Sequence, residues 1–408
     1  MVGVVAAGLV AILPPAAVAQ ERATAGDPID LFTGLHSRES DDIVLDGSPP
    51  IRLRRSYRNG DLVSRAFGIG TSHSYNLFLF SDSASLAYVD LILEDGARIH
   101  YVRTSPGSGP VGAEYVHTAT PSAYFMSRLR WTGMSWDIER RDGIRYRFLP
   151  CHEERYRRLP CALIEIRDER GHQLTLARDE LGDLTKIQGG WLRTVHLTYD
   201  PARRIVQART WAGAAMTSIS YDYDGPGRLV RVHWSHLNVV TVVAELLQSY
   251  RTWQWPSLRR MWLEQTMEYT YDDRHQMLIV KEPGMELDHE YDQAGRVIRQ
   301  QVAGWGTWTF TYTEAQGRVV QTDVVDPDGL HRRVTFNGNG YSLSDTVAPG
   351  EPNEMATLYE RAPNGNLVTR ITVKCRVAIG VPVAVSAPVT SAAPEAAVKS
   401  RLRSQCAR

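Results

Sequence analysis

The cysteines are the first residues in this sequence whose type and spacing could do chemistry. Cys151 and Cys161 each end a Leu-Pro-Cys triplet, and a charged loop separates the two triplets. This arrangement predicts a hairpin that is closed by a disulfide, as is common in exported proteins. The pairing of Cys375 and Cys406 stays open. The sequence has no Cys-x-x-Cys and no paired Cys/His spacing, so we expect no zinc site.

The other residues that could support catalysis form no recognisable constellation. His233 and His236 would point to opposite faces of a strand, so a shared metal ion is not expected. Ser, His and Asp residues are present, but there is no Gly-x-Ser-x-Gly nucleophile elbow and no Gly-rich phosphate loop. We therefore assign no catalytic, cofactor-binding or metal-binding residues, and we expect a protein that is not an enzyme.

An aromatic and basic segment is the candidate binding patch. It holds Trp253, Trp255 and Trp262 together with several arginines, namely Arg251, Arg259 and Arg260. Such a patch could bind a surface glycan or a protein partner. We favour a second interpretation, the core of a degenerate repeat, because aromatic side chains dominate protein cores.

The composition limits the kind of protein that positions these residues. Hydrophobic residues make up 43% of the 408 residues and charged residues 23%, which excludes a wholly disordered chain. The 46 Lys and Arg residues balance 46 Asp and Glu residues, and this zero net charge argues against a dedicated nucleic-acid binder. The length allows two or three domains, or one domain followed by a repeat array.

The first 19 residues are typical of a signal peptide. An apolar run over 2–13 is followed by Pro14 and Pro15, and an Ala-x-Ala pattern ends at Ala19. We expect cleavage between Ala19 and Gln20 and an exported mature chain. A buried strand is the alternative reading of the same run. The run is too short to span a bilayer, and no later segment is long and apolar enough, so we expect no membrane span after cleavage.

Short alternating runs separated by turn residues indicate an all-β fold. The pattern is clear in Ile51-Arg52-Leu53-Arg54, and Asp46-Gly47-Ser48-Pro49-Pro50 is a typical turn segment. No sustained helical period occurs. We expect an N-terminal antiparallel β-domain over 20–150.

A self-similar unit follows and predicts a repeat array over 151–370. Its clearest copies read Tyr-Asp-x-x-Gly-Arg, followed by an apolar residue. The anchors fall at 178, 199, 223, 271, 291, 312, 336 and 359, so the spacing is 20 to 24 residues except for one gap of 48. We interpret that gap as two units, with a degenerate copy near Tyr250. A fixed period of this length indicates a stacked or wound array.

Each unit reads as one β-hairpin. The strand before the anchor alternates between an apolar face and a polar face, the Asp can cap a turn, and the Gly can adopt a left-handed conformation. We expect each Tyr to contact the Tyr of the next unit. The repeat anchors are Tyr199, Asp200, Tyr223, Asp224, Gly227, Arg228, Tyr271, Asp272, Tyr291, Asp292, Gly295, Arg296, Tyr312, Gly317 and Arg318.

The repeat resembles the YD repeat of Rhs proteins, teneurins and the C components of bacterial Tc toxins. The upstream region resembles the domain that opens many Rhs proteins, through the segments 26–34 (GDPIDLFTG), 53–57 (LRRSY) and 67–75 (FGIGTSHSY). The resemblance covers about 27–370. It implies a spiral of β-hairpins wound into a hollow shell that encloses a toxin or presents a surface to another cell. It implies a scaffold and not catalysis by the repeats.

Two segments need separate interpretation beside this family pattern. The segment 326–330 (Asp326-Pro327-Asp328-Gly329-Leu330) resembles a self-cleavage site of Rhs proteins, although a plain turn is the reading we favour. Residues 371–408 are mostly rich in Ala, Val, Pro and Ser and predict a disordered low-complexity tail that is too short for a toxin domain.

Three hypotheses for function follow. The first is a non-enzymatic shell scaffold of an exported bacterial protein, related to polymorphic toxin encapsulation and delivery, from a gene that lacks its toxin domain through truncation. The second is a cell-surface adhesion or carbohydrate-binding protein. The third is an autoprocessing Rhs protein that is cleaved near Asp326 to Leu330. Open sheet edges lead us to expect a protein partner or self-association.

Overall fold

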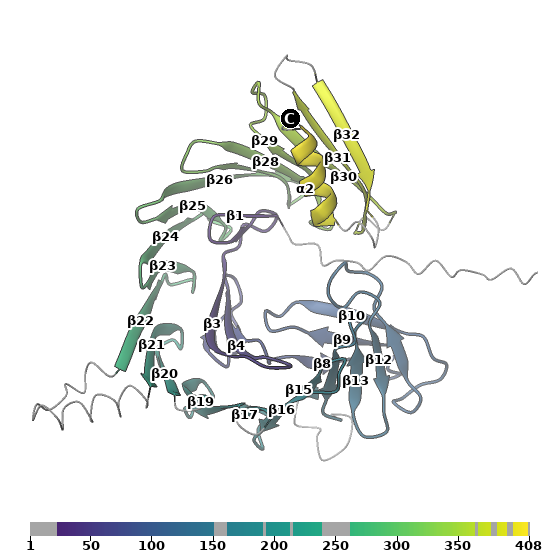
Figure 1. The fold of residues 1–408 in the computed structure, drawn as a ribbon, viewed down its shortest axis with the longest axis vertical. Helices are drawn as coiled ribbons and strands as arrows, with labels where there is room; N and C mark the ends of the chain where they lie inside the picture. Colours follow the sequence, from purple (N-terminus) through teal and green to yellow (C-terminus); the bar gives the residue numbers. More distant parts are fainter. Residues whose placement is uncertain are drawn as a thin grey trace, which may run out of the picture.

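The protein is all-β, with a large antiparallel sheet (Figure 1). The structure is a computed structural model and describes residues 23–150, 161–190, 193–212, 215–238, 262–363, 366–376, 382–389 and 395–406. Within these residues, no helix is both long and apolar enough to cross a membrane. The predicted signal segment 1–19 and its cleavage point between Ala19 and Gln20 lie outside the described residues.

The first described residues, 23–76, form an inner segment on the concave side of the large sheet, drawn in purple in Figure 1. Its strand β4 alternates as the sequence predicts, with Ile51 and Leu53 fully buried and Arg52 exposed. β3, β4 and β7 pair into a small antiparallel sheet. The strands of the inner segment are β1 (Thr24–Ala25), β2 (Ile29–Asp30), β3 (Ser37–Leu45), β4 (Ile51–Arg58), β5 (Ser64–Arg65), β6 (Gly68–Ile69) and β7 (Thr71–His73).

The next strands form a closed ring. Each strand from β8 to β15 pairs with the following one, and β15 also pairs with β8 through Cys161 opposite Leu79. Fully buried side chains such as Tyr101, Tyr115 and Phe148 fill the ring. Its strands are β8 (Phe78–Phe80), β9 (Tyr88–Ile92), β10 (Arg98–Arg103), β11 (Glu114–Val116), β12 (Arg128–Trp131), β13 (Trp136–Glu139), β14 (Arg145–Phe148) and β15 (Cys161–Arg167).

The sheet continues from β15 into a curved wall of hairpins, here called the repeat wall, over residues 173–388. The expected boundary near residue 150 does not interrupt the sheet, because β14 pairs with β15 across it. The strands of the wall are β16 (Gln173–Arg178), β17 (Leu184–Gly189), β18 (Arg193–Tyr199), β19 (Ile205–Ala212), β20 (Ala215–Tyr223), β21 (Leu229–Asn238), β22 (Trp262–Tyr271), β23 (Met277–Glu282), β24 (Met285–Tyr291), β25 (Val297–Val302), β26 (Gly306–Ala315), β27 (Arg318–Val325), β28 (His331–Phe336), β29 (Ser342–Val347), β30 (Met355–Arg361), β31 (Val368–Arg376) and β32 (Pro382–Pro388).

A β-bulge precedes the repeat anchors of the wall. The strand register shifts between Asp222 and Tyr223, and it shifts in the same way immediately before Tyr199, Tyr271 and Tyr291. At the turn that follows Tyr223, Gly227 has a φ of +99°, which an L side chain rarely adopts. These four units therefore end in the same local geometry, a bulge and a tight turn, whereas at Tyr312 the register shifts after the anchor, between Thr313 and Glu314.

The degenerate unit expected near Tyr250, within the gap of 48 residues between the anchors at 223 and 271, stays a prediction. β21 pairs directly with β22, with Leu237 opposite Trp262. Tyr223 and Tyr271 are therefore neighbouring anchors of the described wall. Tyr250 itself lies outside the described residues.

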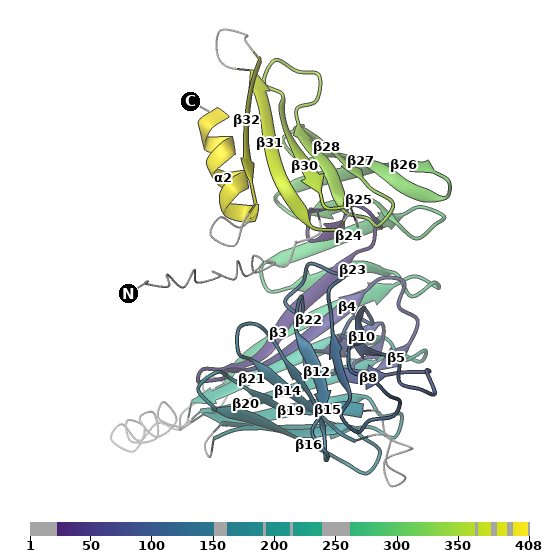
Figure 2. The ribbon, with the colours of Figure 1, turned by 90° about the vertical axis from the view of Figure 1, so that its right-hand side faces the viewer.

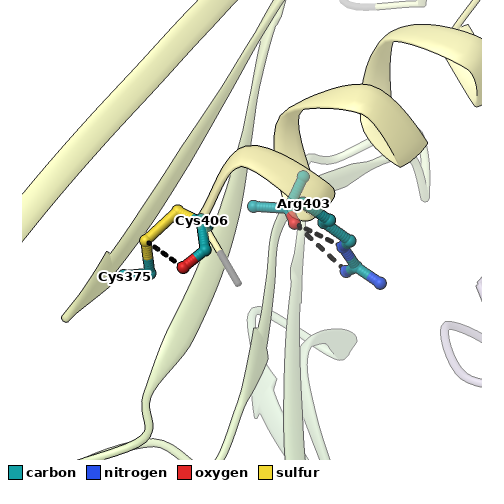
Figure 3. The surroundings of a disulfide bond; sticks show 4 residues. Cys375, Arg403 and Cys406 are labelled. Atoms are coloured by element: carbon teal, nitrogen blue, oxygen red, sulfur yellow. Dashed lines mark hydrogen bonds between the residues drawn. A yellow bond between two sulfur atoms is a disulfide. The ribbon is translucent and has the colours of Figure 1, made fainter. Parts of the chain in front are cut away.

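The prediction of a disordered tail over 371–408 was also wrong for its described residues. β31 reaches Arg376, β32 pairs with it, and the helix α2 (Glu395–Cys406) lies against both strands (Figure 2). Val398 and Leu402 of the helix are buried against the sheet. Cys375 and Cys406 form a disulfide that joins β31 to the end of the helix (Figure 3). An apolar surface and a covalent link therefore order a segment whose composition suggested disorder.

Candidate functional site

The anchor tyrosines bind each hairpin to the preceding one. The Tyr291 hydroxyl donates a hydrogen bond of 2.7 Å to the carbonyl of Met277, the first strand residue after the previous turn. The same bond recurs along the wall, from Tyr199 to Leu184, Tyr223 to Ile205, Tyr271 to Leu229 and Tyr312 to Val297. Burial raises the pKa of these phenols, so the hydroxyls remain protonated donors.

Where a unit carries both the Asp and the Arg of the motif, these two residues complete the contact. In one turn, the Asp224 carboxylate accepts the backbone N–H of Arg228 at 2.7 Å and its Nε–H at 2.6 Å. The guanidinium carbon of Arg228 then lies 5.3 Å from the ring centroid of Tyr271. Arg204 lies in the same way over Tyr223. At these units an arginine covers the anchor ring, which the sequence pattern did not predict, and the expected contact between successive tyrosines stays a prediction.

Arginines replace the anchor tyrosine at both ends of the array. Arg178 donates from Nε to the carbonyl of Leu163 at 2.9 Å, which is the role of the Tyr hydroxyl elsewhere. Burial lowers its pKa to about 10. Near the other end, Arg361 donates from Nε to the carbonyl of Ser342 at 3.0 Å and follows the register shift. The spacing of the repeat predicted the last anchor at residue 359, whereas in the structure this anchor is Arg361.

The inner segment bonds to backbone groups at the turns of the wall. Ile205 N–H donates to the carbonyl of Ala66 at 2.7 Å, and Val297 N–H donates to that of Gly34 at 2.9 Å. Met277 N–H donates to the Tyr57 hydroxyl at 3.1 Å. These N–H groups occupy equivalent positions, directly after the turn that each bulge introduces. The bulges thus present a row of backbone donors that the inner segment satisfies.

Glycines of the inner segment allow this close approach. Gly68 has a φ of +85°, and a Cβ at this position would overlap the carbonyl oxygen of Gly227. The adjacent Ile69 N–H donates to that same oxygen at 3.1 Å. The segment 67–75 therefore needs a glycine where its backbone touches a turn of the wall.

A buried ionic cluster joins β3 and β4 to the wall. Arg55 donates from Nε to both oxygens of Asp42, at 2.9 and 2.8 Å, and the Tyr221 hydroxyl donates to Asp42 at 2.7 Å. The Arg55 and Asp42 side chains are only 5% and 2% exposed. Burial favours the uncharged form of Arg55, but Asp42 and Tyr269 outweigh it and hold the pKa of Arg55 well above its ordinary value. A cavity of about 10 Å³ lies beside this cluster. That volume is about one water molecule.

A second contact holds the start of the inner segment. Arg38 donates to Glu282 at 2.6 Å and to Asp27 at 2.5 Å. The amide of Gln300 exchanges two hydrogen bonds with the backbone of Asp27, at 2.7 and 3.0 Å. The regular spacing of the repeat gave no signal for these contacts, because Gln300 lies 273 residues from its partner.

A Ser, an Asp and a His also meet at the surface. Ser48 Oγ donates to Asp168 at 2.5 Å, and His172 Nδ1 lies 3.0 Å from the same carboxylate oxygen. The bond from Ser48, followed by those of His172, lowers the pKa of Asp168 to about 2. In a catalytic triad the serine hydroxyl is hydrogen-bonded to the histidine, whereas here Ser48 and His172 are each hydrogen-bonded to Asp168. The arrangement fixes the turn before β4 against the wall.

The remaining predicted residues are placed as follows. Cys161 is disulfide-bonded, while its predicted partner Cys151 lies outside the described residues. Trp253 and Trp255 also lie outside them, and of Trp262 only the backbone at the start of β22 is described. His233 and His236 bond to separate threonines, Thr266 and Thr217.

The segment 326–330 is a hairpin turn between β27 and β28. Asp326 N–H donates to the carbonyl of Leu330 at 3.1 Å, and the Asp326 carboxylate accepts the N–H of Leu330 at 2.8 Å. This is the same capping chemistry as in the repeat turns. Elsewhere, no group of three or more His, Cys, Asp or Glu side chains in the described residues is arranged to hold a metal ion.

Comparisons with known proteins identify one domain family. The family described as "Domain of unknown function (DUF6531)" matches residues 26–101, which span the inner segment and the start of the ring. No curated protein matches the chain.

Several solved structures are distantly similar. A TcdB2-TccC3-Cdc42 crystal structure has 12% identity and a TM-score of 0.28, covering 88% of this chain and 19% of that one. A TcdB2-TccC3 structure without its hypervariable C-terminal region has 11% identity and a TM-score of 0.26, covering 88% and 22%. A porin-like protein from Bacteroides uniformis has 11% identity and a TM-score of 0.18, covering 44% and 89%. The chain spans about a fifth of the two Tc structures, and these TM-scores carry no argument about function.

Proposed function

We propose that the chain is an exported, non-enzymatic β-scaffold of the Rhs/YD-repeat kind, whose wall is a partial shell related to toxin encapsulation and delivery. The contact network of the repeat carries the proposal. In the units that carry the full motif, the Tyr, Asp and Arg side chains bond to a neighbouring hairpin or to their own turn. Side chains that make these structural contacts hold the wall together and are not free to catalyse a reaction.

The inner segment supports the same proposal. It bonds to repeated backbone positions of the wall, so it acts as an internal brace that sets the curvature. Its ionic pair of Arg55 and Asp42 is buried and fully hydrogen-bonded to tyrosines of the wall. A buried pair of this kind mainly specifies how two elements dock.

The partner proposed is a protein that meets the open end of the sheet, either a second copy of the chain or another Rhs-type polypeptide. β32 is the last strand of the wall and pairs with β31 along one side. Exposed Ala384 and Ser386 lie between Pro382 and Pro388, which lack the backbone donors that strand pairing uses. The edge therefore offers a short docking strand with defined ends.

The test is the mass of the purified chain by size-exclusion chromatography with light scattering, over a hundredfold range of concentration. Wild type is expected to form a larger species at high concentration. The edge variant Ala384→Lys with Ser386→Lys is expected to stay monomeric, because lysines on an edge oppose strand pairing.

The matched control is Leu343→Lys, an exposed position on β29 whose strand is paired on both sides. It should assemble like wild type. A wild-type monomer at every concentration would remove self-association from the proposal and leave another polypeptide as the partner to seek by co-purification. The glycan hypothesis stays a prediction, since Trp253 and Trp255 lie outside the described residues.

A further inference from the structure

Two buried histidines meet where the inner segment contacts β24 and β25. His36 is fully buried and His289 is 4% exposed, and their ring centroids lie 4.2 Å apart. Within the described part of the chain, neither nitrogen of His36 makes a hydrogen bond of good geometry, and Nδ1 of His289 makes none either. Only weaker contacts with the backbone of Asp27, Met277 and Leu278 reach the two rings. Unpartnered polar atoms at such depth call for an explanation.

Gln300 beside them determines the protonation state of His289. Its Oε1 accepts the N–H of Asp27 at 2.7 Å, and its Nε2 donates to the carbonyl of Asp27 at 3.0 Å. These two bonds fix which end of the amide is nitrogen. The same Nε2 lies 2.8 Å from Nε2 of His289, which must therefore act as an acceptor. His289 is thus neutral, with its proton on Nδ1.

A second proton on His289 cannot coexist with this arrangement. It would place an N–H on Nε2 directly against the NH₂ group of Gln300. Turning the Gln300 amide would relieve that contact, but it would set NH₂ against the N–H of Asp27 and oxygen against its carbonyl. His289 therefore cannot be protonated while Gln300 keeps both of its hydrogen bonds to the backbone of Asp27.

The charged groups around the pair also oppose protonation. Arg38 on β3 is the nearby cation, and it already engages the carboxylates of Asp27 and of Glu282 on β23. Tyr57 on β4 and Tyr291 on β24 flank the rings with uncharged phenols. The carboxylates of β24 itself, Glu286, Asp288 and Glu290, alternate with the buried Leu287 and His289 and therefore lie on the opposite face of the strand.

We propose that His36, His289 and Gln300 form an acid-operated latch, in which a proton on His289 releases Asp27 and opens residues 24–36 of the inner segment while the repeat wall stays folded. Burial, and then Arg38, lower the pKa of His289 to about 4. The pKa returns to about 6.5 when the segment opens. The latch is therefore fully closed above pH 6.5 and loses its stabilisation as the pH falls from 6.5 towards 4.

The test is hydrogen–deuterium exchange of the full chain at pH 7.5 and pH 4.5, corrected for the intrinsic pH dependence of exchange. In peptides covering 24–36, the corrected exchange rate is expected to be on the order of 100-fold higher at pH 4.5 than at pH 7.5. Peptides from β19 to β21 should keep their protection. Unchanged protection of 24–36 at pH 4.5 in wild type would overturn the proposal.

Two variants separate the latch from a general effect of acid. His289→Gln cannot be protonated and keeps an oxygen acceptor for Gln300, so its residues 24–36 should stay protected at pH 4.5. His196→Gln, at an exposed position on β18, should behave like wild type. Equal acid opening in wild type and His289→Gln would overturn the proposal. If His289→Gln does not fold, the order of opening in wild type still decides it, since simultaneous loss in 24–36 and β19 to β21 contradicts a latch.

Discussion

Arg296 lies over the ring of Tyr312, with its guanidinium carbon 4.8 Å from the ring centroid, although the two residues belong to different hairpins. The same guanidinium donates a hydrogen bond of 2.7 Å from Nε to the Asp292 carboxylate. One arginine therefore fixes its own turn and the anchor of the next unit. This relationship explains why the repeat joins an Asp, an Arg and a Tyr in a constant order.

The stacked arginine should contribute more than a surface ion pair. Arg296→Lys is expected to lower the free energy of unfolding by about 1–2 kcal/mol, because lysine keeps the charge but loses the planar contact. Arg299→Lys is the control, since Arg299 makes a surface pair with Glu290 and should cost less than about 0.5 kcal/mol. Urea denaturation measures both, and equal losses would contradict the structural role assigned to Arg296.

A methyl group at Gly68 should separate the inner segment from the wall. Gly68→Ala is expected to cost more than about 2 kcal/mol, since it adds a clash with Gly227 to an unfavourable positive φ. Gly171→Ala isolates the second effect, because Gly171 has a φ of +87° with open space around it, and should cost about 1 kcal/mol. Thermal or urea unfolding would show the difference, and similar losses would exclude the close contact.

Glu94 should make stability depend on pH near neutrality. Burial raises the pKa of its carboxyl to about 7, so the folded state holds this proton more tightly than the unfolded state. Its contribution is full below its ordinary value of 4.5 and is lost as the pH rises through 7.

The variant Glu94→Gln should remove this dependence. It is expected to exceed wild type in stability at pH 8 by about 1–2 kcal/mol and to differ less at pH 5. Exposed Glu180→Gln serves as the control and should leave the pH profile unchanged. Urea unfolding between pH 5 and pH 8 measures it, and parallel profiles for wild type and Glu94→Gln would refute the assignment.

The link between Cys375 and Cys406 should hold α2 on the sheet. The disulfide closes a separation of 31 residues, for which loop-closure entropy gives about 3–4 kcal/mol. In the double variant Cys375→Ser with Cys406→Ser, amide exchange in α2 is expected to rise at least tenfold while β20 and β21 stay protected. Unchanged exchange in α2 would mean that burial of Val398 and Leu402 holds the helix without the link.

The sequence by itself determined the hairpin unit. Alternation before each anchor, a capping Asp and a Gly three residues later all act within a few residues, as between Tyr223 and Leu229. Local patterns of this kind predict strand and turn whatever the rest of the chain does. The all-β class was therefore readable from the sequence, and so was the path of most of the wall.

Only the tertiary structure decided which distant segments meet. Nothing local marks Gln300 as the partner of Asp27, or Val297 as the donor to Gly34, because the partners in both bonds are more than 250 residues apart in the sequence. The packing of α2 on the sheet was likewise decided by burial, of Val398 and Leu402 among others. Spacing and composition describe the chain one segment at a time, whereas these features depend on the surface that another segment presents.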